Sequence, residues 1–358
     1  MHTMIVYYIS AHGFGHAARS LEVLRHLPQD VPLLVKTGVP RWFFEQELAG
    51  HQWEHVAAEF DCGMVQQDGM RVDVARTMEL YRRICRKNQR RFAAEAAWLR
   101  ESGARVVVSD TASFPLAVAK EAAVPGVALG NFTWHDIYEP VIGENPAYRD
   151  VMEILREEYS CATLSLLTQP HLAMSALPHQ VSTPVITRAG RSIREELCRE
   201  LEIDPASRLF LIYVGKQGLD GVDWKRLERM AGVEFLTLHN IAEGVSNLHV
   251  LPSARWHHPD ITASVEAVIG KPGYGIVGEC LGNGTPLIYT SREQFAEYDV
   301  LHDALQRWGA GVFLPPERFA ALDWAGSLQG LDRLPRRDVF ALNGAEFCAD
   351  RIMQLYRK

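Results

Sequence analysis

Residues 265–299 read VEAVIGKPGYGIVGECLGNGTPLIYTSREQFAEYD. The stretch begins with an apolar run, passes through a loop with glycines at 270, 273 and 275, and continues with the apolar spacing of a helix. This order of strand, tight loop and helix is typical of a parallel α/β sheet. The unpaired N–H groups and the positive dipole end at the start of such a helix favour an anion, so the loop predicts a diphosphate site.

The residues after the glycine loop fit the rest of a nucleotide sugar. Glu279 lies one helical turn beyond Gly275, where its carboxylate could accept hydrogen bonds from a ribose diol. A second apolar strand, Leu287–Tyr289, ends in a polar loop at residues 291–297. Because open α/β sheets bind ligands at the carboxyl ends of parallel strands, we predict a nucleotide-sugar pocket here.

The composition is that of an ordinary globular protein. The chain has 358 residues, enough for two domains, each with a core of its own. Hydrophobic residues make up 47% and charged residues 23% of the chain. The formal net charge of -7 gives no basic excess, which argues against nucleic acid as the main partner.

Cysteine spacing and the first residues predict a cytoplasmic protein. The six cysteines form no CxxC pair, which favours reduced thiols and argues against a structural zinc site. The opening residues MHTMIVYYIS lack the basic lead and the cleavage site of a signal peptide. No run approaches the roughly 20 apolar residues of a membrane span.

A second glycine loop follows the first apolar strand, Met4–Ile9. Its spacing, Gly13-x-Gly15-x-x-Ala18, also satisfies the dinucleotide fingerprint, so an NAD or FAD site is an alternative. Such a site needs an acid at the end of the next strand to hold the ribose. That strand ends in Lys36-Thr37-Gly38 instead, which disfavours the nicotinamide or flavin interpretation.

His16, at the start of the following helix, is a candidate general base. A later strand, residues 105–110, reads RVVVSD and ends in Asp110. In a doubly wound sheet both residues lie at the carboxyl edge, so the carboxylate could orient the imidazole and stabilise its charged form. The alternative is that each residue only caps a helix.

Other segments of the first half carry candidate acceptor contacts. A predicted helix at about residues 74–99 has a basic face, which is a solvated surface or a docking site for an anionic acceptor, an acidic membrane or RNA. The aperiodic loop at residues 60–73 and the polar loop at residues 130–136 are placed to contact an acceptor. A core role for Trp134 is the alternative in the second loop.

The second half repeats the pattern of the first. Residues 170–191 lose periodicity and suit a connection between domains. Ser192 and Glu195 form a predicted capping box for a helix at residues 192–201. The next strand, residues 208–214, ends in Gly215 and Lys216, which could meet a phosphate or form a plain turn. A helical tail at residues 338–356 is predicted to cross back to the first domain. The predicted domains are therefore residues 1–180, which residues 338–358 join, and residues 190–335.

Four motifs carry a resemblance to a known family. They are HGFGHAARS at 12–20, VVSD at 107–110, NFTWHDIY at 131–138 and KPGYGIVGECLGNGTPLIY at 271–289. Together they resemble the two-domain GT-B glycosyltransferases, especially the family 28 type that includes the lipid-linked N-acetylglucosaminyl transferase of peptidoglycan synthesis. They also resemble the glycosyltransferase-like N-terminal region of plant L-arabinokinases. The resemblance implies an α/β fold of two Rossmann-like domains that face one another across a cleft.

The resemblance implies a role for each matched residue. The base would be His16, with Asp110 as its partner. A nucleotide diphosphate sugar, usually UDP-linked, would be bound by Gly215, Lys216, Lys271, Pro272, Gly273, Tyr274, Gly275, Glu279, Glu293, Gln294 and Glu297. The acceptor would meet His12, Gly13, Phe14, Gly15, Asn131 and Trp134. Relatives place a DQ or DHQ pair near the sugar, where this chain has Arg292-Glu293-Gln294.

These observations favour an inverting glycosyltransferase that moves a hexosyl or other glycosyl group to an acceptor hydroxyl. No DxD motif occurs in a suitable loop, so we expect neither a metal nor a cofactor. The acceptor is a small molecule, a lipid-linked group or a macromolecule, and a peripheral membrane contact is one option. The alternatives are a nucleotide-sugar-binding or regulatory protein without transfer activity, and a nucleotide-sugar epimerase.

Overall fold

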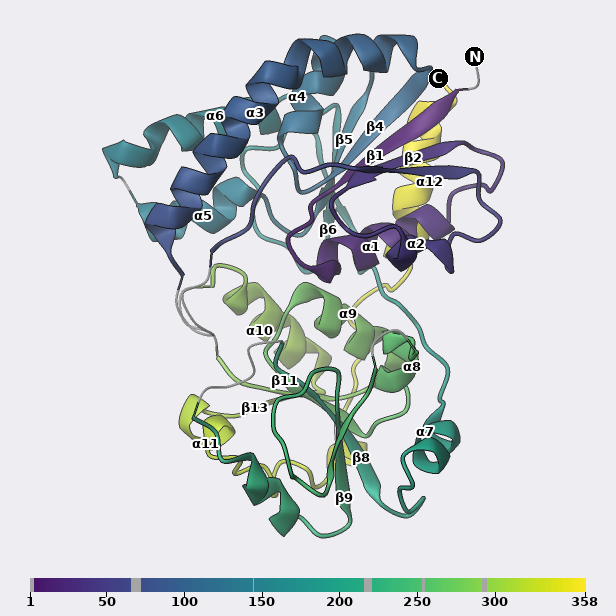
Figure 1. The fold of residues 1–358 in the computed structure, drawn as a ribbon, viewed down its shortest axis with the longest axis vertical. Helices are drawn as coiled ribbons and strands as arrows, with labels where there is room; N and C mark the ends of the chain where they lie inside the picture. Colours follow the sequence, from purple (N-terminus) through teal and green to yellow (C-terminus); the bar gives the residue numbers. More distant parts are fainter. Residues whose placement is uncertain (1–2, 66–71, 144, 216–220, 253–254, 292–294) are drawn as a thin grey trace. The chain divides into compact units, whose positions relative to one another are not determined.

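The computed structural model describes residues 3–65, 72–143, 145–215, 221–252, 255–291 and 295–358. The chain divides into two compact units (Figure 1). Unit 1 contains the described residues up to Ile186 together with Asn343–Lys358, and unit 2 contains Thr187–Leu342. Along the described residues, the chain enters unit 2 after Ile186 and returns to unit 1 at Asn343.

Unit 1 is built on a seven-stranded sheet in the order β3-β2-β1-β4-β5-β6-β7, and all its strand pairs are parallel. The chain builds outward from β1 in one direction and from β4 in the other, so the strand order reverses between these two neighbours. Such a switch point is where doubly wound sheets bind ligands. The strands are β1 (Met4–Ile9), β2 (Leu33–Thr37), β3 (Trp53–Ala57), β4 (Ala104–Asp110), β5 (Gly126–Gly130), β6 (Leu164–Thr168) and β7 (Gln180–Thr183).

Helices cover both faces of this sheet because successive side chains of β1 point to opposite sides. Ile5, Tyr7 and Ile9 pack with α1 and α12, whereas Val6 and Tyr8 pack with α3 and α4. Figure 1 shows these two pairs of helices on opposite sides of the sheet. The helices of unit 1 are α1 (Phe14–Arg25), α2 (Trp42–Glu45), α3 (Val74–Glu101), α4 (Phe114–Glu121), α5 (Trp134–Ile142), the short 3₁₀ helix η1 (Pro146–Tyr148), α6 (Arg149–Tyr159) and α12 (Gly344–Tyr356).

The predicted helix at residues 74–99 is confirmed as α3, but part of its basic face is not merely solvated. Arg82 pairs with Asp150 at 2.6 Å, and Arg91 donates to the carbonyl oxygen of Glu59 at 2.6 Å. Arg86 and Lys87 are exposed. The face therefore combines contacts within unit 1 with cations that point outward.

Unit 2 contains a six-stranded sheet in the order β10-β9-β8-β11-β12-β13, again with parallel pairs. Its strand order reverses between β8 and β11. The strands are β8 (Arg208–Tyr213), β9 (Val233–Thr237), β10 (Leu248–Val250), β11 (Ala267–Gly270), β12 (Leu287–Tyr289) and β13 (Gly311–Phe313). The helices are α7 (Arg194–Glu200), η2 (Trp224–Arg229), α8 (His258–Thr262), α9 (Tyr274–Asn283), α10 (Tyr298–Trp308), α11 (Pro316–Ala320) and η3 (Leu331–Arg333).

The predicted capping box at Ser192 is wrong. Helix α7 begins at Arg194, its N-cap is Ile193, and no side chain caps it. Ile193 is buried, and its N–H donates to Ser264 Oγ at 2.7 Å. Packing against the segment around Ser264 therefore sets the start of α7.

The predicted return of the tail to the first domain is confirmed, although the helix starts later than expected. Asn343 pairs with Ile186 in an antiparallel bridge, and α12 begins at Gly344 rather than near residue 338. Cys348, Ile352 and Met353 of α12 are buried in the core that also contains α1. Their spacing of three and four residues gives α12 the single apolar face that unit 1 covers.

No described helix is long and apolar enough to cross a membrane. All six cysteines are free thiols, as predicted. In the described part of the chain, no three His, Cys, Asp or Glu side chains are grouped so that they could hold a metal ion.

We expect Ile352→Ala to destabilise unit 1 by about 2–5 kcal/mol, because it leaves a cavity in a core where this side chain has no exposed surface. Urea unfolding followed by circular dichroism measures the change. The control is Gln354→Ala on the exposed face of the same helix, which should change stability by less than about 0.5 kcal/mol. Equal effects of the two changes would show that α12 does not stabilise unit 1.

A half-buried acid of α6, Glu158, gives unit 1 a pH dependence. Burial raises the pKa of Glu158 to about 7, although Ser113 Oγ donates to its carboxylate at 2.5 Å. The folded state therefore favours the neutral acid, so stability is full below pH 4.5 and falls as pH rises through about 7.

Glu158→Gln should therefore stabilise unit 1 at pH 8 by about 1–3 kcal/mol, after allowance for solvent screening of a half-buried group, and have little effect at pH 4. Urea unfolding at both pH values measures this. The control is Glu157→Gln at the exposed neighbouring residue, whose effect on the free energy of unfolding we expect to be the same at both pH values. An equal effect of Glu158→Gln at both pH values would contradict the assignment.

Candidate active site

The first site lies at the switch point of unit 1, where β1 and β4 end side by side. Ile9 of β1 is in register with Asp110 of β4. The chain leaves β1 through Gly13, whose positive φ of 78° suits glycine, and enters α1. This places His16 Nδ1 3.0 Å from Asp110 Oδ1. The sequence-predicted pair is thus brought together, and neither residue is the N-cap of a helix.

Asp110 is fully buried and receives hydrogen bonds on both carboxylate oxygens. Arg19 donates through Nε to Oδ2 at 3.0 Å and through Nη2 to Oδ1 at 2.5 Å. The hydroxyl groups of Ser20 and Thr111 donate at 2.5 and 3.1 Å. Burial raises the pKa of Asp110, but the Arg19 guanidinium and His16 outweigh it and hold this pKa well below its usual range. Asp110 is therefore a carboxylate at neutral pH.

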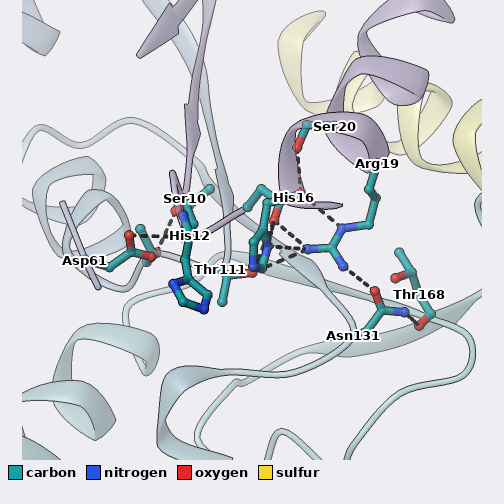
Figure 2. Close-up of polar contacts among 12 residues, drawn as sticks. Ser10, His12, His16, Arg19, Ser20, Asp61, Thr111, Asn131 and Thr168 are labelled. Atoms are coloured by element: carbon teal, nitrogen blue, oxygen red, sulfur yellow. Dashed lines mark hydrogen bonds and ion pairs between the residues drawn. The ribbon is translucent and has the colours of Figure 1, made fainter. Parts of the chain in front are cut away.

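Arg19 extends this network toward two further strands. Its Nη1 donates to Asn131 Oδ1, and Asn131 Nδ2 donates to the carbonyl oxygens of Thr168 at 2.5 Å and Pro170 at 2.9 Å. Figure 2 shows the Arg19 guanidinium between His16 and Asn131. Asn131 thus holds the Arg19 side chain in place. This is a structural role in addition to the acceptor contact predicted for Asn131. The sequence prediction missed Arg19, although it lies one helical turn beyond His16.

Thr111 holds a backbone conformation that β-branched residues rarely adopt. Its φ is 72°, in the left-handed region. This conformation places Thr111 Oγ1 3.1 Å from His16 Nδ1. The Thr111 carbonyl accepts from Tyr159 OH at 2.6 Å. Strained residues of this kind cluster at functional sites.

A second buried acid, Asp61, lies on the other side of His16 (Figure 2). Ser10 Oγ donates to its Oδ1 at 3.0 Å, and Trp134 Nε1 donates to its Oδ2 at 2.7 Å. Burial raises the pKa of Asp61, and the bonds from Trp134 and Ser10 oppose this. Trp134 is only 2% exposed, so its indole is part of the core beneath the loop, with its ring centroid 6.0 Å from that of His16.

Of the residues predicted to contact an acceptor, those of the loop at 12–15 are open to solvent, whereas Asn131 and Trp134 are buried. Phe14 is 46% exposed, and a Cβ atom added at Gly13 or Gly15 would meet no atom within 4 Å. His12 keeps an exposed face, yet burial of its ring and the nearby His16 lower its pKa to about 4. His12 is therefore neutral at pH 7.

We expect Arg19→Met to destabilise unit 1 by about 3–5 kcal/mol, because Asp110 stays buried without its main cationic partner. Urea unfolding at pH 7 measures the change. The control is Arg25→Met on the same helix, whose side chain is 43% exposed and pairs with Glu22. We expect less than about 1 kcal/mol there. A loss of stability as small as that of Arg25→Met would show that the other hydrogen-bond donors are enough to stabilise the buried Asp110 carboxylate.

The second site is the glycine loop of unit 2, at the ends of β8 and β11. Gly270 must be glycine, since an added Cβ would lie 2.2 Å from the carbonyl oxygen of Tyr213. Gly273 is the N-cap of α9, and no side chain caps this helix. A Cβ added at Gly273 or Gly275 would meet no atom within 4 Å. A helix start without a side-chain cap suits an anion.

Glu279, one turn further along α9, is bound by residues that sequence reasoning missed. Its Oε2 receives a short hydrogen bond from His258 Nδ1, and Thr262 Oγ1 donates to the same atom at 3.4 Å. Arg188 Nη1 is 3.8 Å from Oε1. Burial raises the pKa of Glu279, but His258 and then Arg188 outweigh it and lower this pKa.

The remaining predicted donor residues are distributed around this loop. Pro272 is buried, Lys271 and Tyr274 are half-buried, and Gly215 is exposed with a positive φ of 81° after β8. Glu297 is half-buried at the N-cap of α10. Lys216, Glu293 and Gln294 lie outside the described residues.

Comparison with known proteins identifies the fold. No protein-family model matches the chain. The L-arabinokinase of Arabidopsis thaliana is 28% identical over 359 residues, which cover 97% of this chain and 34% of that protein. The chain thus spans about a third of the length of this curated relative.

Solved structures share the fold over nearly the whole chain. The glycotransferase of kitacinnamycin has a TM-score of 0.63 at 14% identity, covering 98% of both chains. UGT2 of Phytolacca americana, complexed with UDP-2fluoro-glucose and pterostilbene, has 0.58 at 14%, covering 99% of this chain and 94% of that one. MurG of Acinetobacter baumannii has 0.56 at 13%, covering 99% and 100%. The chain therefore has the GT-B glycosyltransferase fold, as predicted, with two Rossmann-like units.

Proposed function

We propose that the protein transfers a glycosyl group from a nucleotide diphosphate sugar, UDP-linked, to an acceptor hydroxyl, with inversion and without a metal. The observation that carries this proposal is the buried His16–Asp110 pair at the switch point of a glycosyltransferase fold. A carboxylate that orients an imidazole beside an open loop is the arrangement that general-base catalysis needs.

The contacts of His16 define how it would act. Nδ1 lies 3.0 Å from Asp110 Oδ1, 3.1 Å from Thr111 Oγ1 and 3.1 Å from Arg19 Nη2, so the Asp110 carboxylate is its charged acceptor. When Nδ1–H donates to Asp110, Nε2 keeps its lone pair and takes the proton of the acceptor hydroxyl. The acceptor oxygen then forms a bond to the anomeric carbon as the bond from that carbon to the diphosphate breaks. Asp110, held ionised by Arg19, stabilises the imidazolium that results.

Unit 2 would receive the departing diphosphate. The diphosphate carries negative charge as it leaves. The uncapped start of α9 offers it backbone N–H groups and the positive end of the helix dipole. The nucleotide of UGT2, a uridine diphosphate sugar, supports a UDP-linked donor for this chain.

A second candidate is a nucleotide-sugar-binding or regulatory protein without transfer activity. Arg19 and Ser20 already occupy both oxygens of Asp110, which reduces the help that this carboxylate gives to His16. In addition, the chain matches only a third of the L-arabinokinase, whose name describes a kinase.

Incubation with UDP-, GDP- and dTDP-sugars, followed by mass spectrometry, separates these functions. Free nucleotide diphosphate is the result expected for transfer, or for hydrolysis when no acceptor is supplied. Thermal stabilisation without consumption of the donor indicates the binding protein. An isomerised sugar on an intact nucleotide would indicate an epimerase and overturn the proposal.

We expect His16→Ala to lower turnover by about 100-fold or more while nucleotide binding changes little, given the usual contribution of a general base. Donor consumption and calorimetric binding of UDP measure the two quantities. The control is His26→Ala at the C-cap of the same helix, where the imidazole contacts the carbonyl oxygen of Glu22. Turnover of His16→Ala equal to that of the control would rule out His16 as the base.

A further inference from the structure

We propose that His258, held by Glu279, is the residue that meets the ribose of the bound nucleotide, and that Glu279 is its positioning residue. This inference rests on the proposed nucleotide-sugar function. It replaces the simpler expectation that the Glu279 carboxylate itself binds the ribose diol.

The Glu279 carboxylate is poorly placed to serve a ligand directly. The residue is 6% exposed. Oε2 is engaged by His258 Nδ1 and by the Thr262 hydroxyl, and Oε1 has the Arg188 guanidinium at 3.8 Å. Both oxygens of Glu279 thus already face donors of the protein, and a ribose diol would have to compete with them.

The atom that remains available is Nε2 of His258. It is buried and has no hydrogen-bond partner among the described residues. A buried polar atom left in this state costs about 1–3 kcal/mol, so a ligand that satisfies it gains affinity. With Nδ1–H donating to Glu279, Nε2 is an acceptor in the neutral ring and an N–H donor in the charged ring. The natural complement of Nε2 is therefore a hydroxyl group, which both donates and accepts.

The position of His258 agrees with a ribose contact. His258 begins α8, which packs against α9, the helix whose start faces the proposed diphosphate position. The Tyr213 ring lies edge-on to the imidazole, with 5.1 Å between the ring centroids. Tyr213 ends β8 opposite Gly270 and is 37% exposed, so it lies at the same sheet edge. Since Nε2 is buried, a ligand hydroxyl can reach it only after a side chain at this edge, such as the Tyr213 ring, has moved.

The test is calorimetric binding of UDP against 2′-deoxy-UDP, and of GDP against 2′-deoxy-GDP, to the full chain. We expect the wild-type protein to favour a ribonucleotide by about 5–10-fold, the worth of one hydrogen bond. His258→Asn retains an amide that can donate to Glu279 but lacks Nε2, so it should bind both sugars within about twofold of each other. His258→Phe, which removes both nitrogens, should give the same result.

Two further variants separate this role from a structural one. Glu279→Gln can still accept from Nδ1, so we expect it to retain most of the ribose preference. The matched control is His249→Phe. His249 lies on the edge strand β10, and its Nε2 is 2.8 Å from Glu234 Oε2. The side chains of His249 and His258 are exposed to a similar extent. The control should leave the ribose preference unchanged.

The outcomes distinguish this inference from the function on which it rests. A ribose preference that survives in both His258 variants, or that is missing in the wild-type protein, overturns the role of His258 alone. Failure of the wild-type protein to bind any of the four nucleotides overturns the proposed function as well.

Discussion

The arrangement of unit 1 depends on one buried charge. A carboxylate in a protein core must be given donors, since an unpaired ion there is far less stable than in water. Asp110 obtains them from α1, through His16, Arg19 and Ser20, and from its own neighbour Thr111. The first helix is therefore tied to the end of β4, and the loop that joins β1 to α1 is held at the sheet edge. Stability and the candidate chemistry use the same contacts.

Unit 2 solves the same problem with different residues. Glu279 is buried on a helix rather than at the end of a strand, and its partners come from α8 and from the segment that enters the unit. In both units an imidazole Nδ1 meets a carboxylate and a glycine loop lies nearby. The difference lies in the cations, because Arg19 contacts Asp110 directly whereas Arg188 stays 3.8 Å from Glu279. His258 is therefore the nearest partner of Glu279, whereas Asp110 divides its hydrogen bonds between His16 and Arg19.

Much of the fold could be predicted from the sequence because glycine loops and apolar strands are local signals. The loop around Gly273 and the pair His16 and Asp110 follow from strand ends, which a parallel sheet brings to one edge. The predicted start of α12 and the predicted cap at Ser192 were wrong. A bridge between Asn343 and Ile186 sets the start of α12, and a hydrogen bond from the Ile193 N–H to Ser264 sets the start of α7. Such contacts join segments far apart in the chain.

The missed site residues share this cause. Asp61, which was missed, lies in an aperiodic loop, and its partner Trp134 lies on a helix 73 positions away, so no spacing in the sequence relates the two. His258 precedes Glu279 by 21 positions, across a strand and a loop. Arg19 is the exception, because its distance of one helical turn from His16 was visible. A basic residue on the face of α1 that carries His16 is a local signal that could have been used.

The double passage of the chain between the units bears on how the protein is made. Unit 1 takes α12 from Gly344–Tyr356, whereas every described segment of unit 2 lies between Thr187 and Leu342. On the ribosome, unit 2 can close its core as soon as its own residues have emerged. The face of the first sheet that receives Cys348 and Ile352 must wait until α12 has also emerged. The unit that begins first along the chain is thus completed after unit 2, and until then part of its apolar core stays uncovered.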